Sequence, residues 1–471
     1  MKTKSHKTID FKYRKAKLNL ADGESTDCII TIGNEKEYSL IYTNSNINSN
    51  CVQCFDKVFK YTFFDKAGVM ENPSSNGDLD FDSEDAKVLY KNTKFIYYFY
   101  YVFYTIDDIY PSNKLVDSIS VNYSYLKDWL YKGDMVNIDI KENSITIESR
   151  KYSIKTPKYT VLFELKSDYP EYSVSNAEDI KIGFFSEVTF MYNEPVEFNK
   201  CLEDIEDLKR FLAFHFDSKV DVSGGIGEHS SVRFSINCPY FKNSVNKKHL
   251  NYYGFHKINY FPDENELGKM YNKYLEKCKD DDFASVFEIF SKLLVNAKDI
   301  PEVTFLLCMR CIEKIVASCV YEKGEIEKII QENDLNGQSI GAITLSKIKE
   351  NINHKSGKGY NWTKTKLYIL LYMSMSDFKY DYFLQVILNF FKPKDILKSI
   401  NYIWEYRNEC AHISENKVPL PVKQYFDSVC YLLCKIMIGS ELLGMDSQKL
   451  YKAYMFSLPR FDKTFDLEEY K

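Results

Sequence analysis

The stretch Tyr406-Arg407-Asn408-Glu409-Cys410-Ala411-His412 lies near the end of a C-terminal half that is rich in helical patterns. Pro419 and Pro421, which follow it, interrupt helices or begin new ones. On a helix, Asn408 and His412 share one face, whereas Arg407 and His412 are separated by roughly 140° around the axis. Arg407 and His412 can therefore meet at one ligand only if the helix ends or bends here, or if a second subunit contributes.

Arginine and histidine together can cleave RNA without a metal ion. The 2′-hydroxyl must lose a proton, the leaving oxygen must gain one, and the phosphorane needs fixed positive charge. Histidine titrates near neutral pH and can act as base or acid, and arginine offers paired hydrogen bonds to phosphate oxygens. A structural role is the alternative, because cations in the last turn of a helix favour its dipole and cap its free carbonyls.

The same spacing occurs a second time, at Arg210 and His215. The residues between them are all apolar, which indicates a mostly buried amphipathic helix with polar ends. Of the two pairs, only that of Arg407 has Asn directly after the arginine. The block at 406–412 is therefore the better candidate for catalysis.

From about residue 299 to residue 445 the sequence resembles the HEPN superfamily of all-helical RNases and nucleotide-binding modules, in its ApeA-like branch. The resemblance is carried by the block at 406–412 and by Phe305-Leu306-Leu307-Cys308-Met309-Arg310-Cys311-Ile312-Glu313-Lys314-Ile315-Val316, an apolar helical pattern that includes Arg310 and Glu313. The portion up to about Pro262 also resembles the β-rich domain that precedes HEPN in ApeA-type defence proteins, notably at Leu202–Phe216.

The resemblance implies a metal-independent endoribonuclease that needs no cofactor and acts as the toxic effector of abortive antiviral (antiphage) defence. It assigns proton transfer to His412, phosphate binding to Arg407 and a positioning role to Asn408. It also implies a homodimer or higher oligomer through the HEPN domain, with two motifs facing each other. For Glu313 two readings stay open: a solvent-facing charge beside Arg310, or a supporting residue inside the bundle near the motif.

Other functions fit the same resemblance. The HEPN domain could be a noncatalytic module for dimerisation or for nucleotide or RNA binding that regulates a separate effector, or the chain could be an antitoxin-like partner of one. Because a toxic RNase must be restrained, the N-terminal domain is the candidate regulator, sensing a viral protein or nucleic acid.

The composition of the 471-residue chain predicts two to three globular domains, with 45% hydrophobic and 16% aromatic residues. A net charge of -5 argues against a protein that coats nucleic acid indiscriminately, so an RNA substrate needs a local basic patch. Such a patch is offered by residues 354–366, with Lys355, Lys358, Tyr360 and Trp362 as RNA-binding candidates. A solvated loop with its Trp packed inward is the other reading.

No metal site is predicted. Asp78, Asp80 and Asp82 imitate the start of a calcium loop, but the later glycine and glutamate of such a loop are missing. Cys51 and Cys54 have zinc-knuckle spacing without a partner pair nearby. We expect the cysteines to be reduced thiols, and the chain to be cytoplasmic, because neither a signal peptide nor a membrane-spanning run is evident.

The predicted fold class is α+β: a β-rich sandwich or barrel-like domain over 1–262, a helical connection over 263–299, an all-α HEPN bundle over 300–445, and a C-terminal helix and tail over 446–471. Alternating or apolar runs predict strands at 27–32, 94–105, 118–123, 135–140, 144–148, 160–165, 188–192, 231–236 and 256–261. Ser223–Ser230, with its three glycines, reads as a flexible turn. Helical patterns occur at 199–216, 264–279, 283–297, 301–320, 324–333, 363–375, 380–389, 394–410 and 422–443.

Overall fold

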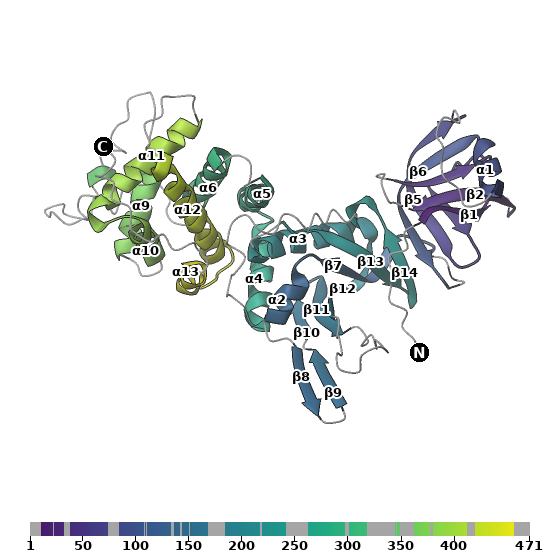
Figure 1. The fold of residues 1–471 in the computed structure, drawn as a ribbon, viewed down its shortest axis with the longest axis horizontal. Helices are drawn as coiled ribbons and strands as arrows, with labels where there is room; N and C mark the ends of the chain where they lie inside the picture. The colour runs from purple at the N-terminus through teal and green to yellow at the C-terminus, as the bar shows by residue number, and fades with distance from the viewer. Residues whose placement is uncertain are drawn as a thin grey trace, which may run out of the picture. The chain divides into compact units, whose positions relative to one another are not determined.

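The computed structural model forms two compact units: a β-rich unit of residues 1–209 and 220–246, and a helical unit of residues 210–219 and 247–471 (Figure 1). The structure describes residues 11–21, 23–32, 38–73, 84–107, 109, 111–132, 136–141, 144–149, 151–167, 184–216, 219–241, 262–296, 301–317, 344, 346–348, 362–376, 380–411 and 420–455. The predicted α+β class and β-rich N-terminal region are confirmed. The predicted strand at 256–261, the predicted helix at 324–333 and the acidic run Asp78–Asp82 lie outside the described residues.

The first part of the β-rich unit is a closed antiparallel barrel. The strands around it run in the order β6, β3, β2, β1, β4, β5 and back to β6. Their bounds are β1 (Phe11–Asn19), β2 (Ser25–Ile32), β3 (Ser39–Thr43), β4 (Cys51–Phe55), β5 (Lys60–Glu71) and β6 (Phe95–Thr105). The sequence predicted either a sandwich or a barrel-like domain, and this part of the chain forms a barrel.

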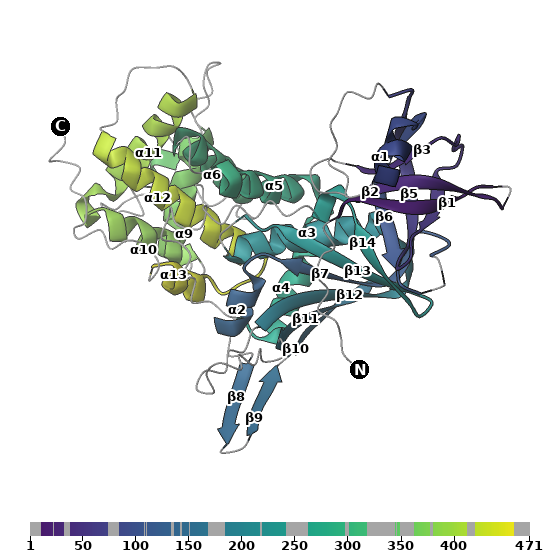
Figure 2. The same ribbon diagram turned by 45° about the vertical axis from the view of Figure 1, so that its right-hand side comes forward.

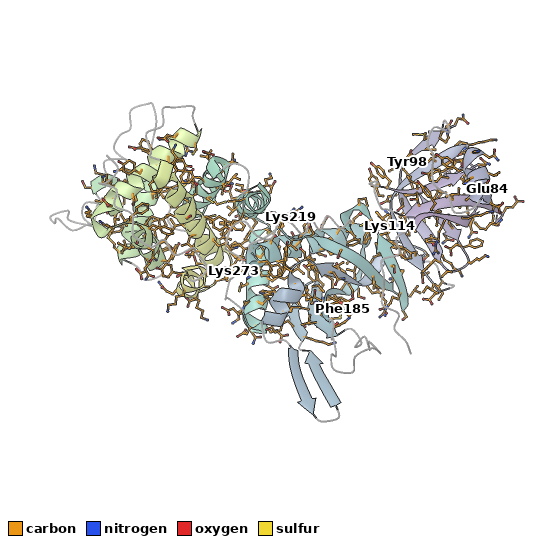
Figure 3. All side chains as sticks on the ribbon, viewed as in Figure 1. Glu84, Tyr98, Lys114, Phe185, Lys219 and Lys273 are labelled. Carbon is orange, nitrogen blue, oxygen red and sulfur yellow. The ribbon has the colours of Figure 1, made fainter. Side chains whose placement is uncertain are left out.

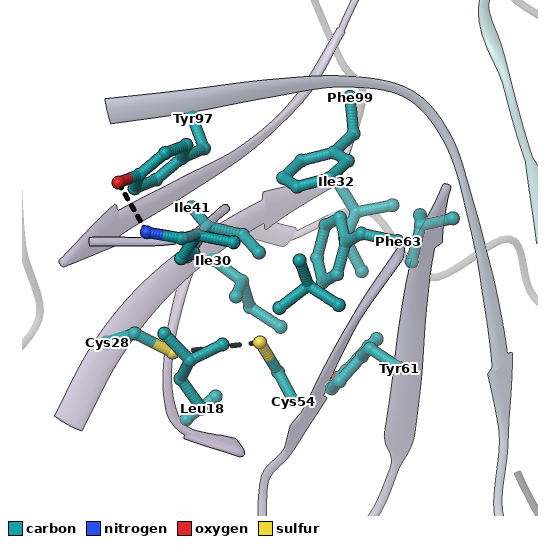
Figure 4. Packing of buried hydrophobic residues seen from close by; sticks show 14 residues of the cluster. Leu18, Cys28, Ile30, Ile32, Ile41, Cys54, Tyr61, Phe63, Tyr97 and Phe99 are labelled. Atoms are coloured by element: carbon teal, nitrogen blue, oxygen red, sulfur yellow. Dashed lines mark hydrogen bonds between the residues drawn. The ribbon is translucent and has the colours of Figure 1, made fainter. Parts of the chain in front are cut away.

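The barrel interior is filled by side chains that alternate along the strands (Figure 4). On β2, Cys28 and Ile30 are fully buried and Ile32 nearly so. Tyr97 places its hydroxyl inside, where it accepts a hydrogen bond from the Ile47 backbone N–H at 2.7 Å. Cys54, half of the pair with zinc-knuckle spacing, is a buried thiol of this interior.

The outer face of the barrel carries a second apolar cluster. Helix α1 (Glu84–Lys91) packs against β2 and β3, with Ala86 near Ile29 and Leu40. Tyr98, on the outward face of β6, is half-buried against this cluster (Figure 3). Both faces of β3 are therefore buried, which explains why Ser39–Thr43 shows no polar and apolar alternation.

An open antiparallel sheet continues from the barrel through β6. Phe95–Phe99 pair with β3, and Val102–Tyr104 pair with β14, so one long strand belongs to both sheets. The order onward is β14 (Val232–Asn237), β13 (Val222–His229), β7 (Leu115–Tyr123), β12 (Phe184–Glu197), β11 (Tyr159–Ser167) and β10 (Lys151–Lys155). Tyr123 on β7 donates from its hydroxyl to the Ile205 carbonyl of α3 (Phe198–Phe216) at 2.9 Å. This bond holds α3 to the sheet.

Two smaller elements complete the β-rich unit. Helix α2 (Leu126–Lys132) follows β7, and β8 (Val136–Lys141) pairs with β9 (Ser144–Ser149) in a separate hairpin, drawn apart from the larger sheet in Figure 2. Both hairpin strands were predicted from their alternation of isoleucine with polar residues.

The glycines at 224, 225 and 227 form part of strand β13 instead of the predicted flexible turn. The register with β7 shifts between Ser223 and Ile226, and Gly224 has φ +71°, so this end of the strand contains a bulge. A Cβ on Gly227 would lie 2.5 Å from the Phe234 ring, which is buried and stacks on Phe103. These glycines therefore make room for aromatic rings, a role that glycine spacing alone does not reveal.

We predict that Gly227→Ala destabilises the β-rich unit by about 1–3 kcal/mol, because the added methyl group overpacks a ring that cannot move freely. The measurement is chemical unfolding of both proteins. Gly68→Ala is the matched control, since a Cβ there meets its nearest neighbour, Tyr98, only at 4.0 Å. Equal losses in the two variants would contradict the packing explanation.

The helical unit contains α4 (Glu264–Lys277), α5 (Asp281–Asn296), α6 (Pro301–Ile315), α9 (Trp362–Ser376), α10 (Asp381–Phe390), α11 (Ile396–Ala411), α12 (Leu420–Met437), a π-helical turn η7 (Ile438–Leu442) and α13 (Ser447–Met455). Helix starts follow the expected chemistry: Asp263 caps α4 by accepting from the Glu266 N–H at 2.8 Å, and Pro301 opens α6. Helix α12 packs on α6 and α10, and α11 packs on α6 and α9.

His215, the histidine of the second Arg-to-His spacing, is buried, with 6% of its surface exposed, whereas the sequence predicted a buried helix with polar ends. It lies in the last turn of α3, within the helical unit, against Phe211 and Phe214. Its Nε2 has no hydrogen-bond partner. Burial, with the nearby Lys435 charge, lowers the pKa of His215 from 6.5 to about 3.

His215 should make the helical unit sensitive to acid. The unfolded chain binds a proton near pH 6.5 and the folded chain does not, so stability falls as pH drops below 6.5, by about 2 kcal/mol near pH 5. We expect His215→Phe to lose less stability than the wild type between about pH 7.5 and pH 5 in urea unfolding. If the wild type and His215→Phe lost equal stability, the acid sensitivity would come from groups other than His215.

Candidate functional site

Arg407 and Asn408 lie in the last turns of α11, which ends at Ala411. The helix forms because Ile396, Ile400, Ile403 and Tyr406 repeat at helical spacing and bury one face. Both residues of the motif are half-buried beside that face. His412 lies outside the described residues, so its position relative to Arg407 stays a prediction.

Arg407 is paired with Glu313 of α6. The guanidinium Nε lies 3.6 Å from Oε1 of Glu313, and the two side chains are 31% and 21% exposed. Arg310, on the same helix, is exposed. Of the two readings of Glu313, the structure therefore has the one in which it lies near the motif, within the bundle of α6, α9 and α11.

Lys366 of α9 extends this arrangement to a third helix. Its Nζ donates a hydrogen bond to the backbone carbonyl of Glu313 at 2.9 Å, and the residue is only 7% exposed. Burial lowers the pKa of Lys366, while the Glu313 carboxylate opposes that shift by favouring the ammonium. Arg407, Glu313 and Lys366 thus form a chain of charges across α11, α6 and α9.

The sequence placed Lys366 both at the end of the basic stretch 354–366 and within the helical pattern at 363–375, and its contact with Glu313 was missed. Helix α9 begins at Trp362, with Lys366 on the second turn. A lysine just before the apolar run Leu367–Leu371 was the available signal, since a helix of that composition must be largely buried. Of the RNA-binding candidates, Trp362 is the first residue of α9, and Lys355, Lys358 and Tyr360 lie outside the described residues.

A second group of ionisable side chains lies where the end of α11 meets α6 and α12. Tyr406 is buried, with its ring centroid 4.4 Å from that of Phe305 on α6. Burial and, secondarily, the Glu302 charge raise the pKa of Asp427 on α12 to about 7, while a hydrogen bond from Tyr406 opposes the shift. The end of α11 is therefore tied to α12 through a carboxyl group that favours its neutral form.

Two neighbours complete this group. Lys423 of α12 pairs with Glu409 at 3.1 Å, which adds an ionic contact between α11 and α12. Burial raises the pKa of Cys410 to about 11, so its thiol stays protonated at neutral pH.

Asp427 should weaken the fold as pH rises. Its folded pKa is above the unfolded value of 3.8, so stability falls between about pH 4 and pH 7 as the buried carboxyl is forced to ionise. Asp427→Asn removes the charge at nearly constant shape, and we expect the variant to gain roughly 2–3 kcal/mol over the wild type on going from pH 5 to pH 8. The check is urea unfolding at both pH values. A constant difference between the two proteins would show that the Asp427 carboxyl does not titrate there.

Among the residues that the structure describes, no group of three or more His, Cys, Asp and Glu side chains could hold a metal ion. The described cysteines are free thiols. None of the described helices has both the length and the apolar character needed to cross a membrane.

Residues 15–278, more than half of the chain, match the family model of the ApeA N-terminal domain 1. The chain belongs to the ApeA family. This membership makes it a protein related to antiviral defence. Searches among curated proteins and solved structures gave no match. The matched region covers the barrel, the open sheet and α4, and ends before Glu313, Lys366 and Arg407.

Proposed function

We propose that this ApeA-family protein is a metal-independent endoribonuclease, the effector of an abortive antiviral defence system, with its active site at the end of α11. The proposal is carried by Arg407, which is half-buried and paired with Glu313. Arg407 lies five residues before His412 in the sequence. An arginine fixed in this way loses little conformational freedom when it binds a phosphate. The Arg407 side chain is 31% exposed, so part of it is accessible to a ligand.

The proposed reaction is transesterification at the 2′-hydroxyl of RNA. His412 transfers protons, taking one from the 2′-hydroxyl or giving one to the leaving 5′-oxygen. Arg407 donates hydrogen bonds to the phosphate oxygens and stabilises the developing negative charge of the phosphorane. Asn408, adjacent to Arg407, positions one of these groups or the phosphate. The products are a 2′,3′-cyclic phosphate and a free 5′-hydroxyl.

A single His412 cannot readily supply both proton transfers at once. A second copy of the chain, with its motif facing the first, would supply the other histidine, which is the reason for proposing a homodimer or higher oligomer. The β-rich unit, to which the family match belongs, is the proposed sensor of a viral protein or nucleic acid. Restraint by such a unit would keep a toxic activity silent until it is triggered.

The test is cleavage of total cellular RNA in EDTA by the wild type, Arg407→Ala and His412→Ala, with folding followed by circular dichroism and assembly by light scattering. We expect both variants to fold and to lose at least about 100-fold in rate, the usual contribution of a proton-transferring residue for His412 and of a transition-state hydrogen-bond donor for Arg407. Arg310→Ala is the matched control, because Arg310 is an exposed arginine on α6. It should cleave like the wild type.

The contrary outcomes separate the alternatives. Equal cleavage by all four proteins would show that the active site does not lie at 406–412. Loss of fold or assembly in Arg407→Ala would make the Arg407–Glu313 pair a structural tether and favour a noncatalytic module. A wild type that binds a partner protein tightly and cleaves no RNA under any condition would favour an antitoxin-like role.

A further inference from the structure

The pair of Arg407 and Glu313 is electrically neutral as a unit. A phosphate is attracted by net positive charge, and a guanidinium whose charge is offset by a carboxylate 3.6 Å away attracts it less. If Arg407 binds an RNA phosphate, a further cation is needed to offset Glu313. The nearby Lys314 is engaged elsewhere, since its Nζ lies 3.1 Å from Asp282 and 2.6 Å from the Ser285 hydroxyl on α5.

Lys366 is the cation that the fold brings to Glu313. It approaches from α9, donates to the Glu313 carbonyl at 2.9 Å, and interacts electrostatically with the Glu313 carboxylate. At 7% exposure it is enclosed by protein, so it cannot readily contact a substrate itself. The three side chains together carry a charge of about one positive unit, whereas Arg407 and Glu313 alone carry none.

We propose that Lys366 offsets the Glu313 carboxylate and thereby lets Arg407 attract an RNA phosphate, while Glu313 fixes the direction of the guanidinium. This inference rests on the proposed function, in which Arg407 binds the phosphate. Lys366 is a positioning residue that acts through Glu313. Burying an ammonium is costly unless it is compensated, and the carbonyl and carboxylate of Glu313 provide that compensation for Lys366.

A structural role for Lys366 and an electrostatic role predict different effects of substituting Glu313. The hydrogen bond of Lys366 is to a backbone carbonyl, which every substitution at position 313 retains. The charge effect depends on the carboxylate, which Glu313→Gln removes while keeping an amide oxygen to accept from Arg407. Glu313→Gln should therefore rescue a charge defect at Lys366 and should not rescue a structural one.

The experiment measures binding of a short fluorescein-labelled RNA oligonucleotide in EDTA at several salt concentrations, in a His412→Ala background that prevents cleavage. We expect Lys366→Met to weaken binding by about tenfold at low salt and to reduce the salt slope by about 0.7, as loss of one effective charge requires. Adding Glu313→Gln to Lys366→Met should return affinity to within about threefold of the parent, because the local charge is restored.

Lys435→Met is the matched control. Lys435 is a second buried lysine of the helical unit, 1% exposed, which donates to the Phe214 carbonyl and lies over the Phe214 and Phe290 rings. Its loss should leave RNA affinity and salt slope unchanged. Thermal unfolding of each variant shows whether a change in binding comes from loss of structure.

Glu313→Gln alone gives an independent readout if Lys366→Met does not fold. It should tighten binding of the oligonucleotide, because one negative charge is removed. Weaker binding, or a double variant that binds no better than Lys366→Met, would overturn the electrostatic role. If Arg407→Ala binds as tightly as its parent, the proposed function fails at Arg407. If Arg407→Ala weakens binding and Lys366→Met does not, only the inference about Lys366 fails.

Discussion

The ion pair between Arg407 and Glu313 is the contact on which the candidate site depends. It connects α11, which carries the motif, to α6, and the Glu313 backbone connects α6 to Lys366 of α9. A half-buried carboxylate must be compensated, and here two cations from different helices do so. The guanidinium is thus held in one direction while part of the Arg407 side chain stays exposed, an arrangement that suits phosphate recognition.

The contact of α11 with α12 is fixed by different chemistry. Tyr406 lies between Phe305 and Phe426, and the neutral form of Asp427 is favoured beneath it. Lys423 and Glu409, whose side chains are only 14% and 6% exposed, add an ionic contact between the same two helices. The end of α11 is consequently held from α6, α9 and α12 together, which defines where the chain leaves the helix toward His412. Polar groups of this kind contribute less to stability than apolar ones, but they specify one arrangement.

Local pattern in the sequence was sufficient for the elements that bury one face. Strand β6, with its run of aromatic residues, and helix α3, with its apolar stripe, lie close to their predicted bounds. Strands β1 and β5 were missed because lysines interrupt them, and β13 was missed because its glycines resemble a turn. Closure of the barrel depends on β1 pairing with β4 and β5 pairing with β6, contacts between distant residues that local periodicity does not encode.

The site shows the same division between local and tertiary information. Arg407 and Asn408 could be named as candidates from spacing, because a cation and a histidine occur together within seven consecutive residues. Glu313 could be named only as one of two readings, since a charged residue on an apolar helix either faces water or finds a partner. Lys366 could not be chosen at all, because its proposed importance comes from a contact with Glu313, which lies 53 positions earlier in the sequence. The net charge near a bound phosphate therefore depends on side chains from three packed helices. The motif alone does not give that charge, because it omits Glu313 and Lys366.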